Sequence, residues 1–535
     1  MDRCQKWIVL GFLFFTACSP ELDEDTLEKF KERLKGEALE EVYGVFDYQP
    51  IWINAEGLSE SGEWFFELLD EEIAADGLDR NDYQYESIKQ RIDSINQGGE
   101  IDALVSLELE ISEAFIHLGN DLHYGRVDPD KRSSKWKMEP KAMDLDVKDI
   151  LIEIGKGNES SFSEVLDQLR PGNRLYEGLR EEMKGVLEAG GSLDKPHIEH
   201  KEALEVGDRH QVVVQVRKAL EAMGEEGISK SKEPEVYDQE LEGAVKRFQK
   251  KHGLKEDGVL GEDFWRAINY STEDLMVKLK VNLERLRWLP DFLSTDGPKV
   301  LVNIPNYFMD YIVDQDTVFS TRAVVGKEYY QTPVFTAKMS YVVFSPYWNL
   351  PEGILWAETI PAILKDKNYL SEHNMEIVDR QGELVKPNKV PWKKLTKEEG
   401  FPYLIRQKPG DDNALGRVKF MFPNSYNIYI HDSPAKALFD RDERAFSHGC
   451  IRIANPDDFA AVLLQDKKEW DKEAIAGAMQ LEKEKQVNLE HKPSVWILYL
   501  TAWRSAGGLQ LREDVYGSDK KLAQKMGGEV SNAFF

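Results

Sequence analysis

Cysteine is scarce in this 535-residue sequence, which contains only Cys4, Cys18 and Cys450. Cys4 and Cys18 lie in the N-terminal segment described below, so Cys450 is the one thiol left for the rest of the chain. A lone thiol cannot form an intramolecular disulfide, and no second ligand pair has the spacing of a zinc finger. The scarcity excludes a disulfide framework and disfavours a metal site, which leaves Cys450 as either a reactive thiol or an inert core residue.

Basic residues are also too few to balance the acidic ones. The sequence holds 69 Lys and Arg against 97 Asp and Glu, a formal net charge of −28 and a pI near 4.9. Such a balance repels the phosphates of nucleic acids and the anionic surface of a membrane, so neither is expected as an electrostatic partner. With 41% hydrophobic residues the chain can fold, and its length predicts about three domains.

Long apolar runs are absent, since no stretch of 18 or more apolar residues occurs and no transmembrane helix is expected. The N-terminus has a short apolar run, Ile8 to Phe15, after Arg3 and Lys6, which predicts a signal peptide over residues 1–17. The Thr-Ala-Cys sequence that ends at Cys18 resembles a lipobox, although Phe15 stands where that pattern prefers Leu. The resemblance implies a lipid on Cys18 and an exported protein, anchored in the cell envelope and facing the periplasm. A cleaved signal of a soluble exported protein is the alternative.

The next regions are predominantly helical. Residues 18–40 form a charged tether, and residues 41–200 form a helical scaffold domain, which ends at a Gly-rich, charged break near Lys195-Pro196. One long helix is predicted by apolar residues that recur every three or four positions. They are Leu104, Leu107, Ile111, Phe115, Leu118 and Leu122.

Residues 205–272 are expected to form a compact unit of three helices. Ordered pieces within it resemble the small three-helix peptidoglycan-binding domain, which implies binding of that polymer. These pieces are Tyr237-Asp238, Ala244 to Gln249, His252 to Leu254 and Asp257 to Gly261. The alternative is a helical spacer that binds only its own neighbours.

Residues 275–535 are predicted to be rich in strands, because runs of β-branched and aromatic residues alternate there with turn residues. The runs are 299–304, 311–313, 322–326, 341–344, 428–430 and 495–500, and a C-terminal extension follows. Residues about 352–408 interrupt this domain, and an insertion of that size commonly acts as a lid or binding loop. A packing subdomain with no gating role is the alternative.

Two histidines flank the remaining thiol. His431 ends a predicted strand 19 residues before Cys450, a spacing that allows the chain to return beside the same strand. An imidazole within hydrogen-bond reach makes a thiolate accessible, which is the chemistry of a cysteine nucleophile. His448 and Gly449 precede Cys450 directly, and the glycine permits close backbone approach, so amides near Cys450 are candidates to face a developing oxyanion.

The segment Ser447 to Arg452, preceded by His431, resembles the signature of the YkuD-type L,D-transpeptidases. Further pieces resemble the longer, YcbB-like branch of that family. They are Val302 to Pro305, Pro346 to Asn349, Tyr403 to Gln407 and His431 to Lys436. The resemblance implies an α+β multidomain protein: a β-rich YkuD-type catalytic domain with a lid-like insertion, a three-helix peptidoglycan-binding domain and a helical N-terminal scaffold. Ser345 departs from the Asn that this branch tends to carry.

The resemblance also implies the reaction. Cys450 would attack the bond before the terminal D-Ala of a peptidoglycan tetrapeptide stem, and a side-chain amine of another stem would resolve the thioester to a 3→3 cross-link. His431 would act as the base, and no metal or organic cofactor would be needed. Carbapenem-type β-lactams are implied as covalent inhibitors.

Other residues of the signature receive narrower roles from the resemblance. His448, Gly449 and the amide of Cys450 are candidates for the oxyanion site, and Asp432 for orienting His431 through its side chain or its backbone. Arg452, Trp348 and Tyr429 are candidates for substrate binding, with a structural salt bridge as the alternative for Arg452. Ser447 is expected to stabilise a turn.

Four alternative functions stay open. Transfer to water would make the protein an L,D-carboxypeptidase, and a protein lysine is another acceptor. A papain-like or NlpC/P60-like cell-wall peptidase is disfavoured, because there the cysteine precedes the histidine, whereas here only His491 follows His448. A non-catalytic wall-binding lipoprotein would need no activated thiol.

Overall fold

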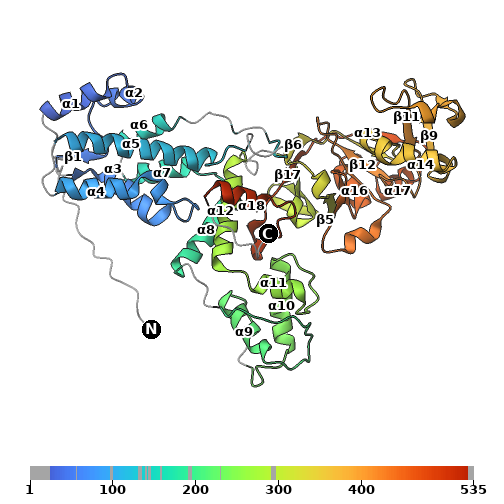
Figure 1. Cartoon of the computed structure of the whole chain (residues 1–535), viewed down its shortest axis with the longest axis horizontal. Helices are drawn as coiled ribbons and strands as arrows, with labels where there is room; N and C mark the ends of the chain where they lie inside the picture. The colour runs from blue at the N-terminus through green and yellow to red at the C-terminus, as the bar shows by residue number, and fades with distance from the viewer. Residues whose placement is uncertain are drawn as a thin grey trace. The chain divides into compact units, whose positions relative to one another are not determined.

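The computed structural model describes residues 24–527 apart from residue 56 and the segments 97–100, 130–134, 139–140, 142–145, 157–158, 191–194, 229–230 and 291–296. The expected signal peptide, residues 1–17, and the expected lipid site, Cys18, lie outside the described residues. The chain divides into two compact units (Figure 1), Met1–Arg126 with Ala142–Gly172, and Val127–Lys141 with Asn173–Phe535.

The first unit is helical. Its elements are α1 (Glu24–Leu34), α2 (Glu40–Gly44), β1 (Ile53–Asn54), β2 (Gly57–Leu58), α3 (Glu60–Glu67), α4 (Tyr85–Asn96), α5 (Ile101–Tyr124), α6 (Val147–Lys156) and α7 (Glu159–Leu169). Helix α5 confirms the periodicity of the sequence, because Leu107, Ile111, Phe115, Leu118 and Leu122 are all buried along it.

A buried carboxylate, Glu108 of α5, ties this core together. It accepts hydrogen bonds from the hydroxyl of Tyr43 at 2.6 Å, from the amide of Ile51 at 2.6 Å and from the amide of Trp52 at 3.0 Å. Burial raises the pKa of Glu108 to about 7, and these hydrogen bonds only partly oppose the shift. Glu108 therefore satisfies the backbone that enters the β1–β2 hairpin while its own ionisation remains costly.

The second unit begins with helix α8 (Arg174–Glu188), which lies in the stretch that the sequence assigns to the scaffold but packs against α12 (Thr272–Trp288) and the hairpin of β18 (Ala502–Ser505) and β19 (Gly508–Leu511). Between α8 and α12 lie the three helices α9 (Val212–Ala222), α10 (Gln239–Lys251) and α11 (Glu262–Ile268). These three have a core of their own, in which Val216, Leu241, Phe248 and Phe264 are fully buried. The predicted compact three-helix unit is therefore present as helices α9–α11 (Figure 1).

An eleven-stranded sheet follows α12. Its strands are β3 (Lys299–Asn303), β4 (Phe308–Val313), β5 (Asp316–Gly326), β6 (Phe335–Lys338), β7 (Tyr341–Phe344), β12 (Val418–Met421), β13 (Ile430–His431), β14 (Ala445–Ser447), β15 (Ile451–Ile453), β16 (Lys485–Asn488) and β17 (Ser494–Leu498). The order is β16-β7-β12-β13-β15-β5-β4-β3-β17-β6, with β14 paired to β5. Strand β13, which ends at His431, and strand β15, which begins directly after Cys450, therefore lie side by side in the interior of the sheet.

Helices α16 (Pro456–Leu463), α17 (Lys472–Ala478) and α18 (Ser518–Lys525) accompany this sheet. Phe459 of α16 packs edge-on to Tyr311 and stacks on Phe319, so α16 covers strands β4 and β5. The buried alternation Ile430, Ile451 and Ile453 belongs to the same core. One face of β13 and β15 is thus fixed by apolar packing. The residues that alternate with these isoleucines along each strand therefore face the other side.

The insertion forms a small subdomain with its own core. Its elements are β8 (Trp348–Asn349), α13 (Glu352–Ile354), a π-helical turn at Leu355–Thr359, α14 (Ile360–Lys365), α15 (Tyr369–Glu372), β9 (Met375–Val378), β10 (Leu384–Val385) and β11 (Leu404–Gln407). The strands pair in the order β10-β9-β11-β8. Leu355, Ile360, Ile377 and Ile405 are buried together between them, so the insertion is folded rather than a plain loop.

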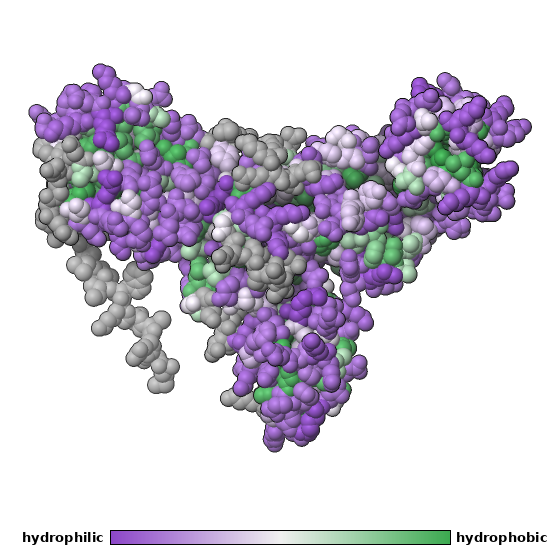
Figure 2. Space-filling model, viewed as in Figure 1, coloured by the Kyte–Doolittle hydropathy of each residue, from purple (hydrophilic) through white to green (hydrophobic). Residues whose placement is uncertain are grey.

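The chain is therefore an α+β multidomain protein, as the sequence predicts: a helical N-terminal region, three helices α9–α11 and a β-rich domain that carries an insertion. Hydrophilic residues cover most of the face shown in Figure 2, which fits the 31% of charged residues. Across the described part of the chain, no helix combines the length and apolar character needed to cross a membrane.

Candidate active site

The register between β13 and β15 assembles the candidate site. The two strands run parallel, with Ile430 opposite Ile451 and His431 opposite Arg452. Cys450 stands one residue before β15, next to Tyr429, whose carbonyl oxygen accepts a hydrogen bond from the amide of Ile451 at 3.1 Å. Because side chains alternate along a strand, Cys450, Arg452, Tyr429 and His431 share the face opposite to the buried isoleucines.

The thiol of Cys450 is partly buried, and its sulfur lies 3.7 Å from the backbone oxygen of Asn427. Burial raises the pKa of the Cys450 thiol, while hydrogen bonds with Tyr429 and the positive charge of Arg452 act in the opposite direction. Tyr429 therefore faces the thiol directly. The sequence suggests Tyr429 only as a substrate contact, because nothing local reveals that it lies opposite Cys450 and influences the thiol.

The ring of His431 is buried on the face of β13 and β15 that also carries Cys450. Its Nδ1 lies 2.5 Å from the backbone oxygen of Asp432, and because a carbonyl oxygen only accepts, this nitrogen carries the proton of the neutral ring. Burial lowers the pKa of His431 to about 3, with a further decrease from the charge of Arg452. The ring is thus neutral at physiological pH and keeps an unprotonated Nε2. No hydrogen bond joins it to the thiol within the described residues.

The side chain of Asp432 has a different task. Its carboxylate accepts hydrogen bonds from the amides of Arg417 at 2.8 Å and Ser433 at 2.6 Å, and from the ammonium of Lys436 at 2.6 Å. Gly416, at φ +62°, passes so close to this carboxylate that a Cβ there would stand 2.3 Å from Asp432 Cγ. Asp432 therefore contacts His431 through its backbone carbonyl, and its side chain is engaged elsewhere.

The turn that presents Cys450 is held by two hydroxyls. Ser447 Oγ donates to the carbonyl of Cys450 at 2.6 Å and accepts from the amide of Gly449 at 3.0 Å, which confirms its expected role in the turn. Thr332 Oγ1 donates to the carbonyl of Gly449 at 2.8 Å. Gly449 adopts φ +114°, a conformation that L side chains rarely take.

These contacts show which backbone amide near Cys450 is free to donate to an oxyanion. The amide of Gly449 already donates to Ser447, so it is not available as the turn stands. The amide of Cys450 donates to no acceptor in the part of the chain that the structure describes. The Cys450 amide is therefore the candidate donor left by the backbone contacts.

Arg452 lies on the same face without a carboxylate partner. No ion pair or hydrogen bond is formed by its guanidinium within the described residues, and its Nε is buried without an acceptor. Burial lowers the pKa of Arg452, whereas the Cys450 and Tyr429 groups raise it. The structural salt bridge considered as the alternative for Arg452 is thus not formed, and its charge remains available beside the thiol.

His448 connects this turn to the insertion. Its ring packs on Tyr330 with 4.7 Å between ring centroids, and its Nε2 lies 3.9 Å from Glu358 Oε1, a residue of the π-helical turn at Leu355–Thr359. Burial lowers the pKa of His448, and the Lys327 charge lowers it further while Glu358 raises it. Glu358 has no recognisable signal in the sequence, because its contact depends on how the insertion folds back.

Trp348 stands apart from this group. It lies on β8, paired with Gln407 of β11, and within the described residues no hydrogen bond or ring contact connects it to Cys450, His431 or Arg452. A search of the same residues finds no group of three or more His, Cys, Asp or Glu side chains able to hold a metal ion. The clustered chemistry is therefore one thiol, one neutral imidazole, one phenol and one guanidinium.

Three parts of the chain match known families. Residues 37–183 match a family described as "Scaffold domain", residues 209–268 one described as "Putative peptidoglycan binding domain", and residues 297–468 one described as "L,D-transpeptidase catalytic domain". The last range includes both His431 and Cys450.

Two curated proteins are similar to part of the chain. A "Putative L,D-transpeptidase" of Haemophilus influenzae is 36% identical over 245 residues, which are 46% of this chain and 48% of that protein. The N-acetylmuramoyl-L-alanine amidase CwlM of Mycobacterium tuberculosis is 36% identical over 83 residues, 14% of this chain and 20% of that protein. The chain thus spans less than half the length of either relative.

Among solved structures, an L,D-transpeptidase from Stackebrandtia nassauensis is 12% identical, covers 57% of this chain and 97% of its own, and has a TM-score of 0.21. The family assignment follows from the sequence comparisons and not from this likeness. The chain carries an L,D-transpeptidase catalytic domain of the YkuD family, together with a peptidoglycan-binding domain and a Scaffold domain.

Proposed function

We propose that this protein is an L,D-transpeptidase that forms 3→3 cross-links in peptidoglycan through a thioester on Cys450. The observation that carries the proposal is the shared face of β13 and β15, which holds the only thiol among the described residues beside an imidazole and an unpaired guanidinium. These groups lie within residues that match an L,D-transpeptidase catalytic domain.

In the first step, the thiol of Cys450 loses its proton to Nε2 of His431, and the sulfur attacks the carbonyl carbon before the terminal D-Ala. The C–N bond breaks, the leaving amine of D-Ala takes the proton from His431, and a thioester remains on Cys450. The backbone carbonyl of Asp432 holds the ring in the tautomer that this step requires. Catalytic hydrogen bonds are often long before substrate binds, so the thiol and His431 need to approach only in the complex.

In the second step, a side-chain amine of another stem attacks the thioester carbon, loses a proton to His431, and expels the sulfur of Cys450, which takes that proton back from His431. The amide of Cys450 stabilises the oxyanion in both steps, and Arg452 pairs with a carboxylate of the stem. Gly449 and His448 support the turn, and Tyr429 and Trp348 contact the substrate. The thioester conserves the energy of the cleaved bond, so the proposed reaction requires no metal or organic cofactor.

The location proposed for this reaction is the cell envelope. Domains that act on peptidoglycan imply a site at the cell wall. We propose in addition that residues 1–17 are removed as a lipoprotein signal and that Cys18 carries the lipid, as the lipobox-like sequence suggests. Metabolic labelling with a fatty-acid analogue would test this, because a Cys18→Ala variant should lose the label.

The reaction itself is tested by incubating the purified protein with tetrapeptide muropeptides and analysing the products by mass spectrometry. A cross-linked dimer that has lost one D-Ala supports the proposal, and Cys450→Ala should form none. Tripeptide without dimer would identify an L,D-carboxypeptidase. Covalent attachment to added protein would identify a lysine acceptor, and unchanged substrate with the native protein would favour a non-catalytic wall-binding lipoprotein.

A further inference from the structure

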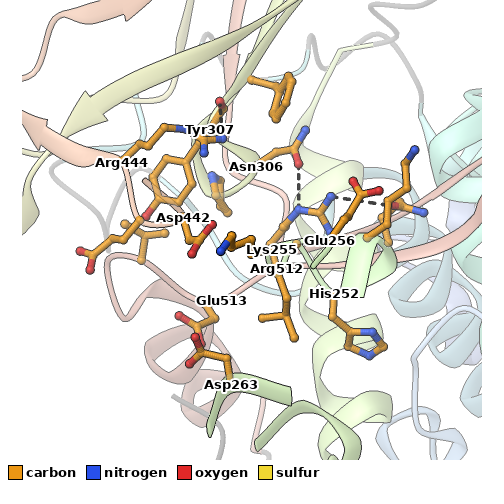
Figure 3. Close-up of a pocket in the computed structure, with 18 of the residues that line it drawn as sticks. His252, Lys255, Glu256, Asp263, Asn306, Tyr307, Asp442, Arg444, Arg512 and Glu513 are labelled. Carbon is orange, nitrogen blue, oxygen red and sulfur yellow. Dashed lines mark hydrogen bonds between the residues drawn. The ribbon is translucent and has the colours of Figure 1, made fainter. Parts of the chain in front are cut away.

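A cavity of about 610 Å³ lies between the three helices α9–α11 and the β-rich domain, away from Cys450. One wall comes from residues 250–256 and from α11, and the other from residues 305–308, 442–444 and 510–515. Figure 3 shows charged side chains from both walls around this space. The volume is in the range of sites for small molecules. None of the Cys450, His431, Tyr429 and Arg452 group lines it.

Two arginines of this cavity have no acidic partner. Arg512 donates to Asn306 Oδ1 and to the carbonyl of Lys251, both at 2.8 Å, so it bridges the two walls through neutral acceptors. Arg444 is buried and donates to the carbonyls of Arg441 at 2.7 Å and Tyr307 at 3.2 Å. Within the described residues neither guanidinium lies within 4 Å of a carboxylate.

Holding a charge away from water without an ion pair is costly, and only the more distant charges of Asp442 and Glu256 stabilise the cations of Arg444 and Arg512, respectively. Burial lowers the pKa of Arg512 to about 10, the charge of Arg444 lowers it further, and the charge of Glu256 acts in the opposite direction. Gly253 has a positive φ and leaves room for Arg512, since a Cβ at that position would stand 2.5 Å from Arg512 Cδ. An anionic group in the cavity would be attracted by both positive charges.

The opposite sign is present in the same cavity. Asp442 and Glu443 are exposed, line the space beside Arg444, and form no hydrogen bond or ion pair within the described residues. Glu256 is also exposed, lines the other wall, and forms no hydrogen bond or ion pair within the described residues. These carboxylates would repel a ligand that carries only negative charge, whereas they would attract an ammonium group. The lining therefore favours a ligand with a carboxylate and an ammonium a few ångströms apart.

We propose that this cavity is a second, non-catalytic site for a peptidoglycan stem peptide, which binds the zwitterionic end of its diamino acid. The ligand carboxylate pairs with Arg444 and Arg512, and its ammonium pairs with Asp442, Glu443 and Glu256. The rings of Tyr307 and Phe308, which Arg444 contacts at 5.3 and 5.5 Å, provide apolar surface for the aliphatic part of that residue. The proposal depends on peptidoglycan as the substrate, and thus on the proposed function, but not on catalysis by Cys450.

The test is photo-crosslinking with a synthetic stem tripeptide that ends in diaminopimelate and carries a diazirine at its N-terminus. The full chain with Cys450→Ala is used so that the peptide is not processed, and labelled residues are mapped by mass spectrometry. Label is expected in residues 250–266, 305–310 or 510–515, and at least ten-fold less of it with Arg512→Gln. Arg504→Gln is the matched control and should keep the label, because Arg504 is an exposed arginine of β18, in the hairpin that precedes Arg512, and it pairs with Glu181.

A double variant, Asp442→Asn with Glu443→Gln, tests the acidic side and affects exposed residues, so it remains informative if Arg512→Gln fails to fold. The native lining should prefer the free amine over the N-acetylated side-chain amine several-fold, and the double variant should lose this preference. Label confined to residues 427–432 and 447–452, label indifferent to both variants, or no label at all would each overturn the proposal. Failure of the proposed function would be seen separately, as absence of turnover by the native protein.

Discussion

Glu358 of the insertion lies 3.9 Å from Nε2 of His448, two residues before Cys450. The insertion therefore reaches the turn that presents the thiol, although its own core lies elsewhere. A cover over this turn would exclude water and allow a thioester to survive until an amine arrives.

Replacing residues 355–400 with a short Gly/Ser linker should raise hydrolysis relative to transpeptidation, as measured by the ratio of tripeptide to dimer in a mass spectrum. Glu358→Gln is the matched control, because a single exposed contact of 3.9 Å contributes little and its loss alone should leave the ratio unchanged. An unchanged ratio in a folded deletion variant would mean that the insertion is only a packing subdomain.

His431→Ala should slow acylation of Cys450 by about 10²–10⁴-fold, because the unprotonated Nε2 that accepts the thiol proton is lost. The measurement is the rate of covalent labelling of Cys450, followed by intact mass. Asp432→Asn is informative beside it, since the backbone carbonyl that orients His431 is retained and acylation should fall less than in His431→Ala. A normal labelling rate in His431→Ala would show that another base operates.

Tyr429→Phe should raise the pKa of the Cys450 thiol, because the hydrogen bond from the phenol lowers it in the native protein. At pH 7.5 the alkylation rate with iodoacetamide should drop about five-fold, the equivalent of one hydrogen bond of about 1 kcal/mol. A profile of rate against pH should show the variant shifted to higher pH. If the two profiles coincide, the phenol does not influence the thiol in solution.

A carbapenem should acylate Cys450, since the strained β-lactam carbonyl is an acyl donor for a thiolate. Ring opening breaks the C–N bond and retains all atoms, so intact-mass analysis should show one addition equal to the mass of the inhibitor. Cys450→Ala should show none. Persistence of the addition in that variant, or its absence from the native protein, would contradict the acylation.

The stability of the first unit should fall as pH rises through about 7, because of Glu108. Its pKa is about 7 in the folded protein against 4.5 as the ordinary value, so the folded state holds a proton that the unfolded state releases. The stabilising contribution is complete below pH 4.5 and is lost progressively up to about pH 7, by about 3 kcal/mol in total. Chemical denaturation at pH 5 and pH 8 should show this decrease in the native protein, and Glu108→Gln should have a smaller one.

The sequence was sufficient where a local pattern carried the information. The apolar repeat through Leu107 and Leu118 predicted helix α5, and the β-branched runs predicted strands such as β3 and β7, because burial on one face follows directly from periodicity. The spacing of His431 and Cys450 likewise identified the region that matches an L,D-transpeptidase catalytic domain.

Tertiary structure decided which atoms meet. The parallel register of β13 and β15 places Tyr429 at the thiol and leaves Arg452 without a carboxylate, and neither contact has a sequence period of its own. The carboxylate of Asp432 is drawn to the turn at Gly416, so only its backbone orients His431. Partners of polar groups depend on which distant segments pack together, and that is a property of the folded chain rather than of neighbouring residues.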